Sequence, residues 1–273
     1  MDLVKKIFFT LSGIITVAIL LVIVSYILIN GLPFIDFEFI FSNPVDSGRS
    51  GGIFPMIISS LYLLVLTALI AVPIGVGSAI YMTQYCKSNA FVNFIRFCSQ
   101  ILSAIPSIIY GLFGFTFLIM FLKLDWSLFA ASVVLAIMSV PTIFQVSEIS
   151  INSVPGELVE ASLGLGANKS QTITSVILPS AISGIFTGII LALTRAISEA
   201  AAVMYVVGST FTVPLSIFDA GRPLPLHLYI LASEGVSLDN AYATASILII
   251  MVLIITVFSN YCLNRYQNKI EGL

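Results

Sequence analysis

The sequence predicts an all-α, polytopic membrane protein with six transmembrane helices. Hydrophobic residues make up 59% of its 273 positions and charged residues only 9%, whereas charged residues form about 25% of an average soluble domain. The mean hydropathy is +1.11, and the apolar residues are grouped into runs of the length that a helix needs to cross a bilayer, about 20 residues. The composition excludes a soluble globular domain, and no basic block indicates nucleic-acid binding.

Six apolar runs are the expected membrane spans: Ile7–Ile29, Ile53–Tyr81, Cys98–Phe121, Ser127–Val146, Ser180–Val207 and Ala241–Leu263. The first run follows Lys5 and Lys6 and is longer than the apolar core of a typical signal peptide, so it is expected to be an uncleaved span. Pro73, Pro106 and Pro141 predict kinks in the next three runs, because neighbouring helices can satisfy the freed carbonyl groups. Such kinks favour a bundle around a path, with the ordinary proline content of membrane helices as the alternative.

The distribution of basic residues predicts that both termini are cytoplasmic and that the protein is a multi-pass protein of the cell membrane. With the N-terminus inside, the inner segments hold seven cations and the outer segments three. The inner set is Lys5, Lys6, Lys87, Arg96, Lys169, Arg265 and Lys269, and the outer set is Arg49, Lys123 and Arg222. Cytoplasmic segments of membrane proteins carry the excess of Lys and Arg, and an even number of spans places the termini on one side.

Arg195 and Glu199 form an isolated charged pair in the fifth apolar run. Arg195 lies 16 residues beyond Pro179, which is roughly 24 Å along a helix, and each charge at such a depth costs about 3 kcal/mol. Because they are four positions apart, the two side chains are expected to share a helix face and to pair. We interpret them as residues that line a solute path, and a purely structural ion pair is the alternative.

Small residues recur at every fourth position of the same run, at Gly184, Gly188, Ala192, Ala196 and Ala200. Such a ridge lets another helix approach closely. The next stripe carries Thr187, Leu191, Arg195 and Glu199. This division is typical of a path-lining helix at a subunit or helix interface, and the alternative is that the ridge packs only within its own bundle.

The segment 147–178 is the least hydrophobic long stretch and is expected to be a cytoplasmic loop. Its acidic first turn predicts a short amphipathic helix over 157–165. Gly164 and Gly166 are expected to break this helix, and a second short helix is expected over 171–178.

This loop resembles the EAA motif of ABC importer permeases, E-A-A-x3-G-x9-I-x-L-P. Here the motif reads Glu160, Ala161, Ser162, three residues, Gly166, nine residues, Val176, Ile177, Leu178 and Pro179. Ser162 replaces the third small residue and Val176 replaces isoleucine. The resemblance implies a type I ABC importer permease fold, whose loop docks onto a separate ATPase subunit. It implies ATPase-coupling roles for Glu160, Ala161, Ser162, Gly166 and Ala167.

From Gly51 onward the chain is similar to phosphate-type permeases of the PstA kind, and Arg195 to Glu199 matches their intramembrane R-A-x-x-E signature. The resemblance implies one permease domain over 1–273, with a core over about 53–263, that forms half of a path for inorganic phosphate. Arg195 and Glu199 would line that path. The implied partners are a second permease subunit (PstC-like), two copies of an ATP-binding subunit and an extracytoplasmic phosphate-binding protein. No enzymatic activity, cofactor or metal is expected in this chain itself.

Three other functions remain as alternatives. An ABC permease for another solute (molybdate, tungstate, sulfate or an amino acid) would share the fold and the coupling loop. An ion-coupled secondary transporter or channel would not need an EAA loop. A membrane enzyme has little support, because the sequence contains no HExxH or GxSxG motif and only one histidine, His227.

Overall fold

The computed structural model describes residues 2–86 and 90–271, so Lys87 lies outside the described residues. The first elements are α1 (Asp2–Gly31), η1 (Leu32–Phe34), α2 (Phe37–Phe41), β1 (Pro44–Val45), η2 (Asp46–Gly48), β2 (Ser50–Gly51), α3 (Phe54–Ile80), η3 (Tyr81–Tyr85), α4 (Ala90–Ala104), α5 (Ser107–Gly114) and η4 (Phe115–Phe121). The remaining elements are α6 (Leu128–Asn152), α7 (Gly156–Gly164), α8 (Lys169–Thr172), η5 (Ile173–Ile177), α9 (Leu178–Ile197), α10 (Leu224–Ser233) and α11 (Leu238–Glu271). The prediction of an all-α membrane protein is confirmed, with one small antiparallel hairpin, β1–β2, as the exception in the described chain.

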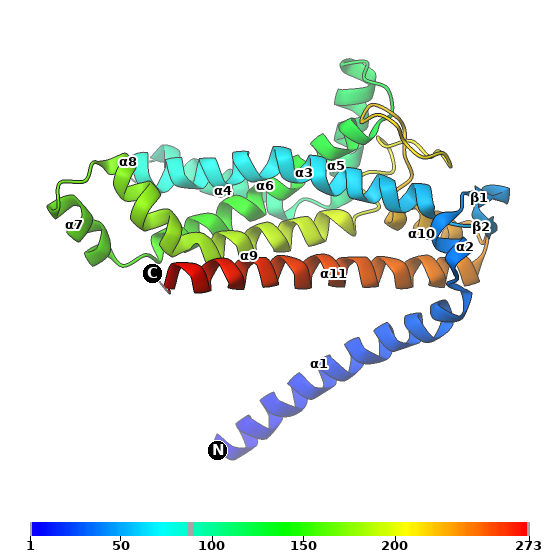
Figure 1. Cartoon of the computed structure of the whole chain (residues 1–273), viewed down its shortest axis with the longest axis horizontal. Coiled ribbons are helices and arrows are strands. Elements are labelled where there is room, and N and C mark those ends of the chain that lie inside the picture. The colour runs from blue at the N-terminus through cyan, green and yellow to red at the C-terminus, as the bar shows by residue number, and fades with distance from the viewer. Residues whose placement is uncertain (1, 87–89, 272–273) are drawn as a thin grey trace.

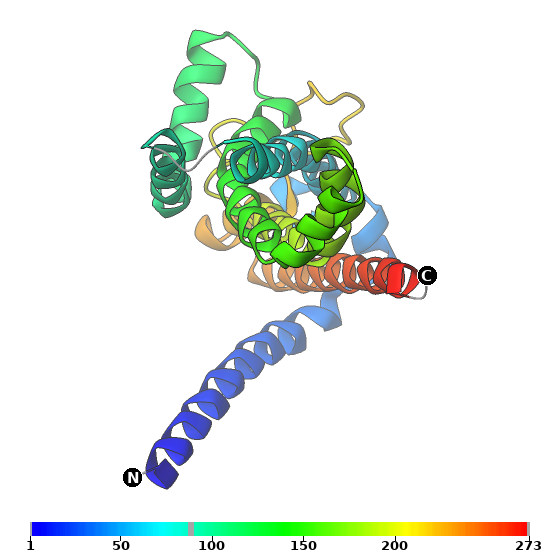
Figure 2. The same ribbon diagram turned by 90° about the vertical axis from the view of Figure 1, so that its left-hand side faces the viewer.

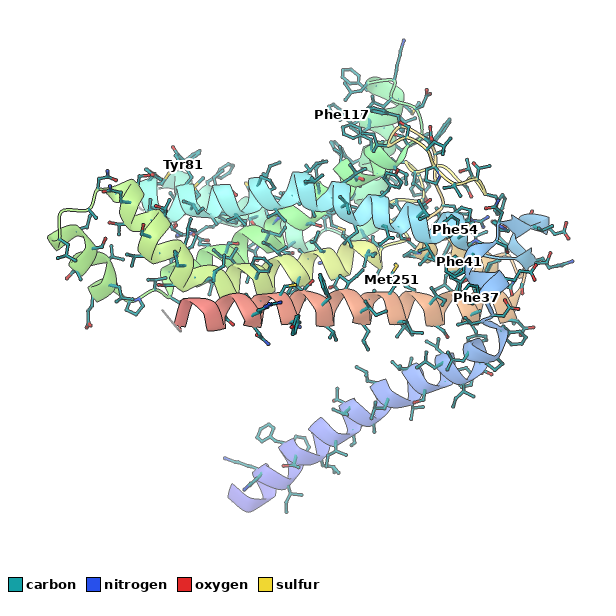
Figure 3. The ribbon with its side chains drawn as sticks, viewed as in Figure 1. Phe37, Phe41, Phe54, Tyr81, Phe117 and Met251 are labelled. Atoms are coloured by element: carbon teal, nitrogen blue, oxygen red, sulfur yellow. The ribbon has the colours of Figure 1, made fainter. Side chains whose placement is uncertain are left out.

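The long helices α3, α6, α9 and α11 run side by side along the longest axis of the molecule (Figure 1). Helix α6 packs against both α3 and α9, and α11 packs against α9. Helices α7 and α8 lie at one end, near the C-terminus, and the β1–β2 hairpin lies with α2 and α10 at the other end. Aromatic rings of Phe37, Phe41 and Phe54 cluster at this second end (Figure 3).

Helix α1 diverges from the bundle, as both views show (Figures 1 and 2). Residues 5–23 are exposed throughout. The helix is attached near its C-terminal end, where the rings of Tyr26 and Tyr242 meet edge to face at 5.9 Å and Gly31 lies directly against α11. Helix α1 therefore starts toward the α7 end of the molecule, where the C-terminus also lies (Figure 1).

The kink predicted at Pro106 is present as a bend of 98° between α4 and α5. Pro106 causes the break, since proline lacks an N–H group and disfavours helical geometry at the residue before it. The Tyr110 hydroxyl donates a hydrogen bond of 2.6 Å to the Leu102 carbonyl across the bend. The described residues contain five helices that could span a membrane by length and composition, or six if this bent pair counts as one span. Pro73 and Pro141 lie inside the unbroken helices α3 and α6.

The second short helix of the loop does not end before Pro179, as the sequence had led us to expect. Residues 169–197 form one continuous helical run through α8, η5 and α9. The π-helical turn η5 lies directly before Pro179, where the missing N–H group and the bulky ring interrupt regular α-helical bonding. The loop between α6 and this run is therefore 153–168, shorter than the expected 147–178.

The fifth span also ends earlier than predicted, at Ile197 instead of Val207. Residues 200–207 form buried turns against α5 and α6. A Cβ atom at Gly111 would lie 2.9 Å from the carbonyl oxygens of Ala201 and Ala202, so α5 directly contacts this backbone. The Val206 carbonyl accepts a hydrogen bond of 3.1 Å from the Ser127 amide, which provides a bonding partner outside any continued helix.

The ridge of small residues packs within the bundle, in agreement with the alternative stated above. Gly184 lies against Ser150 of α6, and a Cβ atom at Gly188 would lie 2.7 Å from the Val146 Cβ atom. Ala192 joins Ala71 and Ala136 in the buried cluster one turn further along. Ala200, the last member of the expected ridge, lies beyond the end of α9.

Candidate coupling loop and charged residues

Helix α7 confirms the predicted short helix and packs on one side against α8 and η5. None of its residues is buried, and only Val159 and Ser162 are partly covered. Large apolar side chains of the loop are nevertheless exposed: Leu158 is 47% exposed, Leu163 49% and Leu165, just beyond the helix, 91%.

Gly166 ends this helix in a left-handed conformation, with φ +88°. Its amide donates to the Leu163 carbonyl at 3.0 Å, and the Ala167 amide donates to the Ser162 carbonyl at 3.2 Å. These two bonds form a Schellman motif, which depends on a residue that tolerates positive φ. The expectation that Gly166 permits the turn is confirmed, whereas the expectation that Gly164 also breaks the helix is wrong, because Gly164 is still helical as the last residue of α7.

Two side-chain contacts join the loop to the helices that follow and precede it. The hydroxyl groups of Ser162 in α7 and Thr172 in α8 lie 3.0 Å apart and are hydrogen-bonded. The ammonium group of Lys169, the first residue of α8, lies 5.1 Å from the centre of the Tyr85 ring in η3. Asn168 and Gln171 form a reciprocal capping box that starts the helix at Lys169.

Arg195 and Glu199 do not share a helix face, so that prediction is wrong. Arg195 lies in the last turn of α9, where the helix dipole favours a cation, and Glu199 follows the helix end. No ion pair joins them, since Arg96–Glu148 is the one salt bridge within the described part of the chain. The end of α9 at Ile197 also removes the basis for placing Arg195 in the middle of a span that reaches Val207.

Helix α9 nevertheless has two distinct faces. Gly188, Ala192 and Ala196 are buried against the bundle, whereas Thr187 and Arg195 are exposed. Among the described residues Arg195 thus has no salt-bridge partner, and it lies on the exposed face of α9.

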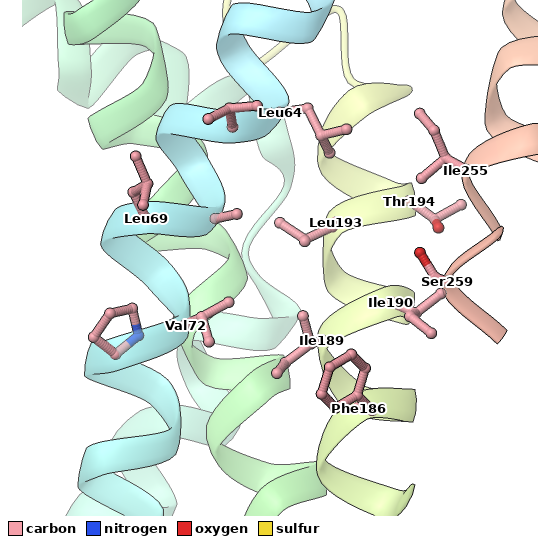
Figure 4. A pocket seen from close by; sticks show the side chains of 13 residues that line it. Leu64, Leu69, Val72, Phe186, Ile189, Ile190, Leu193, Thr194, Ile255 and Ser259 are labelled. Carbon is pink, nitrogen blue, oxygen red and sulfur yellow. The ribbon is translucent and has the colours of Figure 1, made fainter. Parts of the chain in front are cut away.

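A cavity of about 520 Å³ lies between α3, α9 and α11 (Figure 4). Its lining is apolar, as Leu64, Val72 and Ile189 illustrate, and the hydroxyl groups of Thr194 and Ser259 are its polar side-chain groups. Arg195 does not line it. An anion would lose its hydration there without gaining ionic partners, so this cavity does not suit an ionic solute.

A polar contact between α4 and α6 was not predicted. The Arg96 Nη2 atom lies 2.7 Å from the Glu148 Oε1 atom, and one turn earlier Gln145 donates to the hydroxyl groups of Ser99 and Ser103 at 3.1 and 3.0 Å. Arg96 was expected only as one of the cations of the inner segments. The signal that could have found this contact is the spacing of Gln145 and Glu148, which places both on one face of an apolar helix.

At the opposite end, Arg222 and His227 are 3% and 1% exposed. Burial, and to a smaller extent the nearby Arg222 charge, together lower the pKa of His227 to about 3, so the imidazole is neutral at physiological pH. Burial also lowers the pKa of Arg222, while the charge of Glu234 raises it. The guanidinium group lies over the Phe211 ring at 4.7 Å. The Leu224 amide donates a hydrogen bond of 2.8 Å to the Ser60 hydroxyl group, which joins the start of α10 to α3.

Comparisons with known proteins agree with this architecture. The chain is 34% identical to the probable ABC transporter permease protein YqgI of Bacillus subtilis (strain 168), over 97% of this chain and 95% of that protein. It is also 34% identical to the phosphate transport system permease protein PstA of Mycobacterium leprae (strain TN), over 77% and 69% of the two proteins.

Solved structures share the fold. A bacterial alginate ABC transporter matches with a TM-score of 0.69, at 16% identity over 96% of each chain. The MetNI methionine ABC transporter in an inward-facing form matches with a TM-score of 0.63, at 21% identity over 79% of this chain and 94% of that one. The family described as binding-protein-dependent transport system inner membrane component matches residues 71–270. The chain thus belongs to this family of inner-membrane permease subunits of ABC importers.

Proposed function

We propose that this chain forms one half of the translocation path of an ATP-driven importer for inorganic phosphate. Its relatives include permeases named for phosphate transport. The observation that carries the proposal is the combination of an uncovered apolar loop helix, α7, with an unpaired arginine on the uncovered face of α9. The first feature suits docking of an ATPase, and the second suits an anion.

The coupling role follows from the exposure of α7. Leu158, Ala161 and Leu165 follow one another at helical spacing and are all exposed, with Glu160 beside them. A groove on an ATP-binding subunit would cover this apolar side and leave the acidic side chain at its rim. We assign docking to Glu160 and Ala161, which are exposed, and positioning of α7 to Ser162, whose hydroxyl group faces Thr172. We assign the turn that follows to Gly166 and Ala167.

The role in the path follows from the cost of an exposed charge in a membrane. An arginine that faces lipid costs several kcal/mol, roughly 3 on insertion scales. A second permease subunit opposite α9 would enclose Arg195 in a shared, water-filled path and remove that cost. The guanidinium group then offers a two-pronged set of donors for the oxygens of a phosphate ion. We place Glu199, just beyond the helix end, at the same path.

The proposed assembly contains a PstC-like permease subunit, two copies of an ATP-binding subunit and a phosphate-binding protein. In this arrangement the α7 end faces the cytoplasm together with both termini, and the binding protein docks at the end formed by α2, α10 and the hairpin. The exposed surface of α1, residues 5–23, is then free to contact lipid or the second permease subunit. Hydrolysis of ATP takes place in the partner, so this chain is not itself an enzyme.

A permease for molybdate, tungstate or sulfate is the second candidate. The observation that favours it is the same Arg195, because a guanidinium fork binds any tetrahedral oxyanion. Competition between phosphate and these anions during uptake discriminates the two candidates.

The test uses the complete complex in liposomes, with phosphate uptake and ATP hydrolysis measured together. Arg195→Gln should lower uptake by about tenfold or more, because hydrogen bonds to a charged group contribute about 1.5–3 kcal/mol. Arg195→Lys keeps the charge without the fork and should retain part of the uptake. Arg265→Gln, at the exposed end of α11, is the control for loss of a positive charge. Normal uptake by a well-assembled Arg195→Gln complex would contradict the role in the path, and uptake without any ATP-binding subunit would contradict the coupling role.

A further inference from the structure

Ser162 distinguishes this chain from the E-A-A pattern, in which the same position is a small apolar residue. It lies three residues after Val159, on the only side of α7 that is partly covered. Val159 packs against the apolar cluster that contains Ile173 and Ile177. The loop helix is therefore attached along its length by one apolar side chain and one polar side chain.

The polar attachment is the hydrogen bond between the Ser162 and Thr172 hydroxyl groups, which lie 3.0 Å apart. Thr172 is only 2% exposed, so its side chain has little freedom to move. The same residue, Ser162, also provides through its carbonyl the acceptor for the Ala167 amide in the Schellman turn. Ser162 thus connects the loop helix, its terminal turn and the next helix.

The helix on the other side of this bond is the one that carries Arg195. Residues 169–197 are continuous, and Thr172 and Arg195 are 23 residues apart, which is about 35 Å along a helix. The run includes the π-helical turn η5 but is not broken, and its α9 part is packed against α6, so a displacement of its α8 end is carried toward the Arg195 end. The angle between α7 and this helix decides how much of a displacement of α7 reaches it.

We propose that the Ser162–Thr172 hydroxyl bridge is a positioning contact that fixes α7 to the α8–α9 helix, so that movement of a docked ATPase reaches the Arg195 end. This inference rests on the proposed coupling function. Without the bridge, α7 is held by Val159 and by its two chain connections, and it can rotate about that contact while the ATPase moves. The consequence is loss of solute import per ATP hydrolysed, with docking and assembly retained.

The test is a double-mutant cycle in the complete reconstituted complex with inorganic phosphate and the phosphate-binding protein. Ser162→Ala and Thr172→Val each remove one hydroxyl group, and valine keeps the volume of threonine. Each should lower the phosphate imported per ATP by about fivefold, the factor that one neutral hydrogen bond typically contributes. The double variant should be no worse than either single variant, because one bond is lost in all three. Thr172→Ser keeps the hydroxyl group and should import as much phosphate per ATP as the wild type.

A second measurement does not depend on the solute. Spin labels on Leu163→Cys and Ser180→Cys, with the three native cysteines replaced by serine, report the distance between α7 and α9. Ser162→Ala should broaden this distance distribution, and Thr172→Ser should leave it narrow. The bridge would be overturned if every variant imported as much phosphate per ATP as the wild type and kept a narrow spin-label distance distribution. It would also be overturned if the double variant lost the sum of the two single losses. If the wild-type complex imports no phosphate, the proposed function fails, and the label distances still decide whether the bridge fixes α7.

Discussion

Replacement of Gly166 by alanine tests the coupling loop with a single methyl group. The φ angle of +88° at Gly166 is unfavourable for any residue with a Cβ atom, and a left-handed conformation costs an L-residue about 1–2 kcal/mol. No heavy atom lies within 4 Å of the position that the new Cβ atom would take. The whole effect therefore comes from backbone strain, and it shifts the local equilibrium away from the observed turn by about 5- to 30-fold at 25 °C.

Gly164 provides a matched control two residues earlier. Its Cβ position is also free of neighbours within 4 Å, but it lies inside α7 and its φ angle is helical. Alanine there should stabilise the helix by about 0.5–1 kcal/mol. Replacement by alanine should therefore destabilise the turn at Gly166 and stabilise the helix at Gly164. Side-chain volume alone predicts no such difference, because both Cβ positions are free of neighbours.

The assay is phosphate import and ATP hydrolysis by the reconstituted complex, with co-purification of the ATP-binding subunit as the measure of docking. Gly166→Ala should lower import per ATP severalfold, Gly164→Ala should leave it unchanged or slightly higher, and Gly166→Asn should lie between them because asparagine tolerates the left-handed region. Equal losses in the two alanine variants, or no loss at Gly166, would refute the assignment of this turn to coupling.

Three further outcomes are expected. Glu148→Gln leaves Arg96 without its carboxylate and should destabilise the protein in detergent by about 1–3 kcal/mol, seen as a lower Tm; an unchanged Tm would mean that the pair contributes nothing. Gly188→Ala places a methyl group against α6 and should lower stability by about 1–3 kcal/mol, whereas Gly77→Ala, with open space around it, should not; equal Tm values would contradict the close helix packing. Leu165→Cys, in a background without native cysteines, should react with a membrane-impermeant maleimide in inside-out vesicles and not in intact cells; the reverse pattern would invert the proposed topology.

Much of the fold follows from local signals in the sequence. The spans that were predicted well, such as α3 and α6, are long apolar runs whose helical state is fixed by the absence of water. The loop helix α7 was predicted because its signals are short-range: acidic residues in the first turn and a glycine at the end. The turn at Gly166 was predictable for the same reason, since it depends only on the local backbone conformation.

The ends of two helices could not be predicted in this way. The sequence after Ile197 is rich in alanine and favours a helix, yet the helix stops because residues 200–207 pack against glycines of α5 and bond to the start of α6. Tertiary contacts override helix propensity there. Pro106 indicated a kink, but proline alone does not determine the angle, and the bend of 98° depends on what surrounds the two half-helices.

The partners of the charged residues could not be predicted from the sequence either. Arg195 and Glu199 were expected to pair because both were placed on one helix, and that expectation failed with the helix itself. The ion pair that does form, between Arg96 and Glu148, joins residues 52 positions apart. Sequence spacing identifies neighbours along a helix, whereas partners on different helices require the packing of α4 on α6 to be known.

The packing of α6 and α9 constrains how any movement of the loop is transmitted. Gly184 and Gly188 bring the two helix backbones into close contact, with Ser150 and Val146 fitted against them. Sliding or rotating α9 alone would drive these side chains into its backbone, so the two helices must move together. Both also enter the loop: α6 leads into α7 through the turn after Asn152, and α9 is attached to α7 through Thr172. A displacement of α7 therefore acts on a pair of interlocked helices, and its result at Arg195 is a tilt of that pair instead of a change within α9.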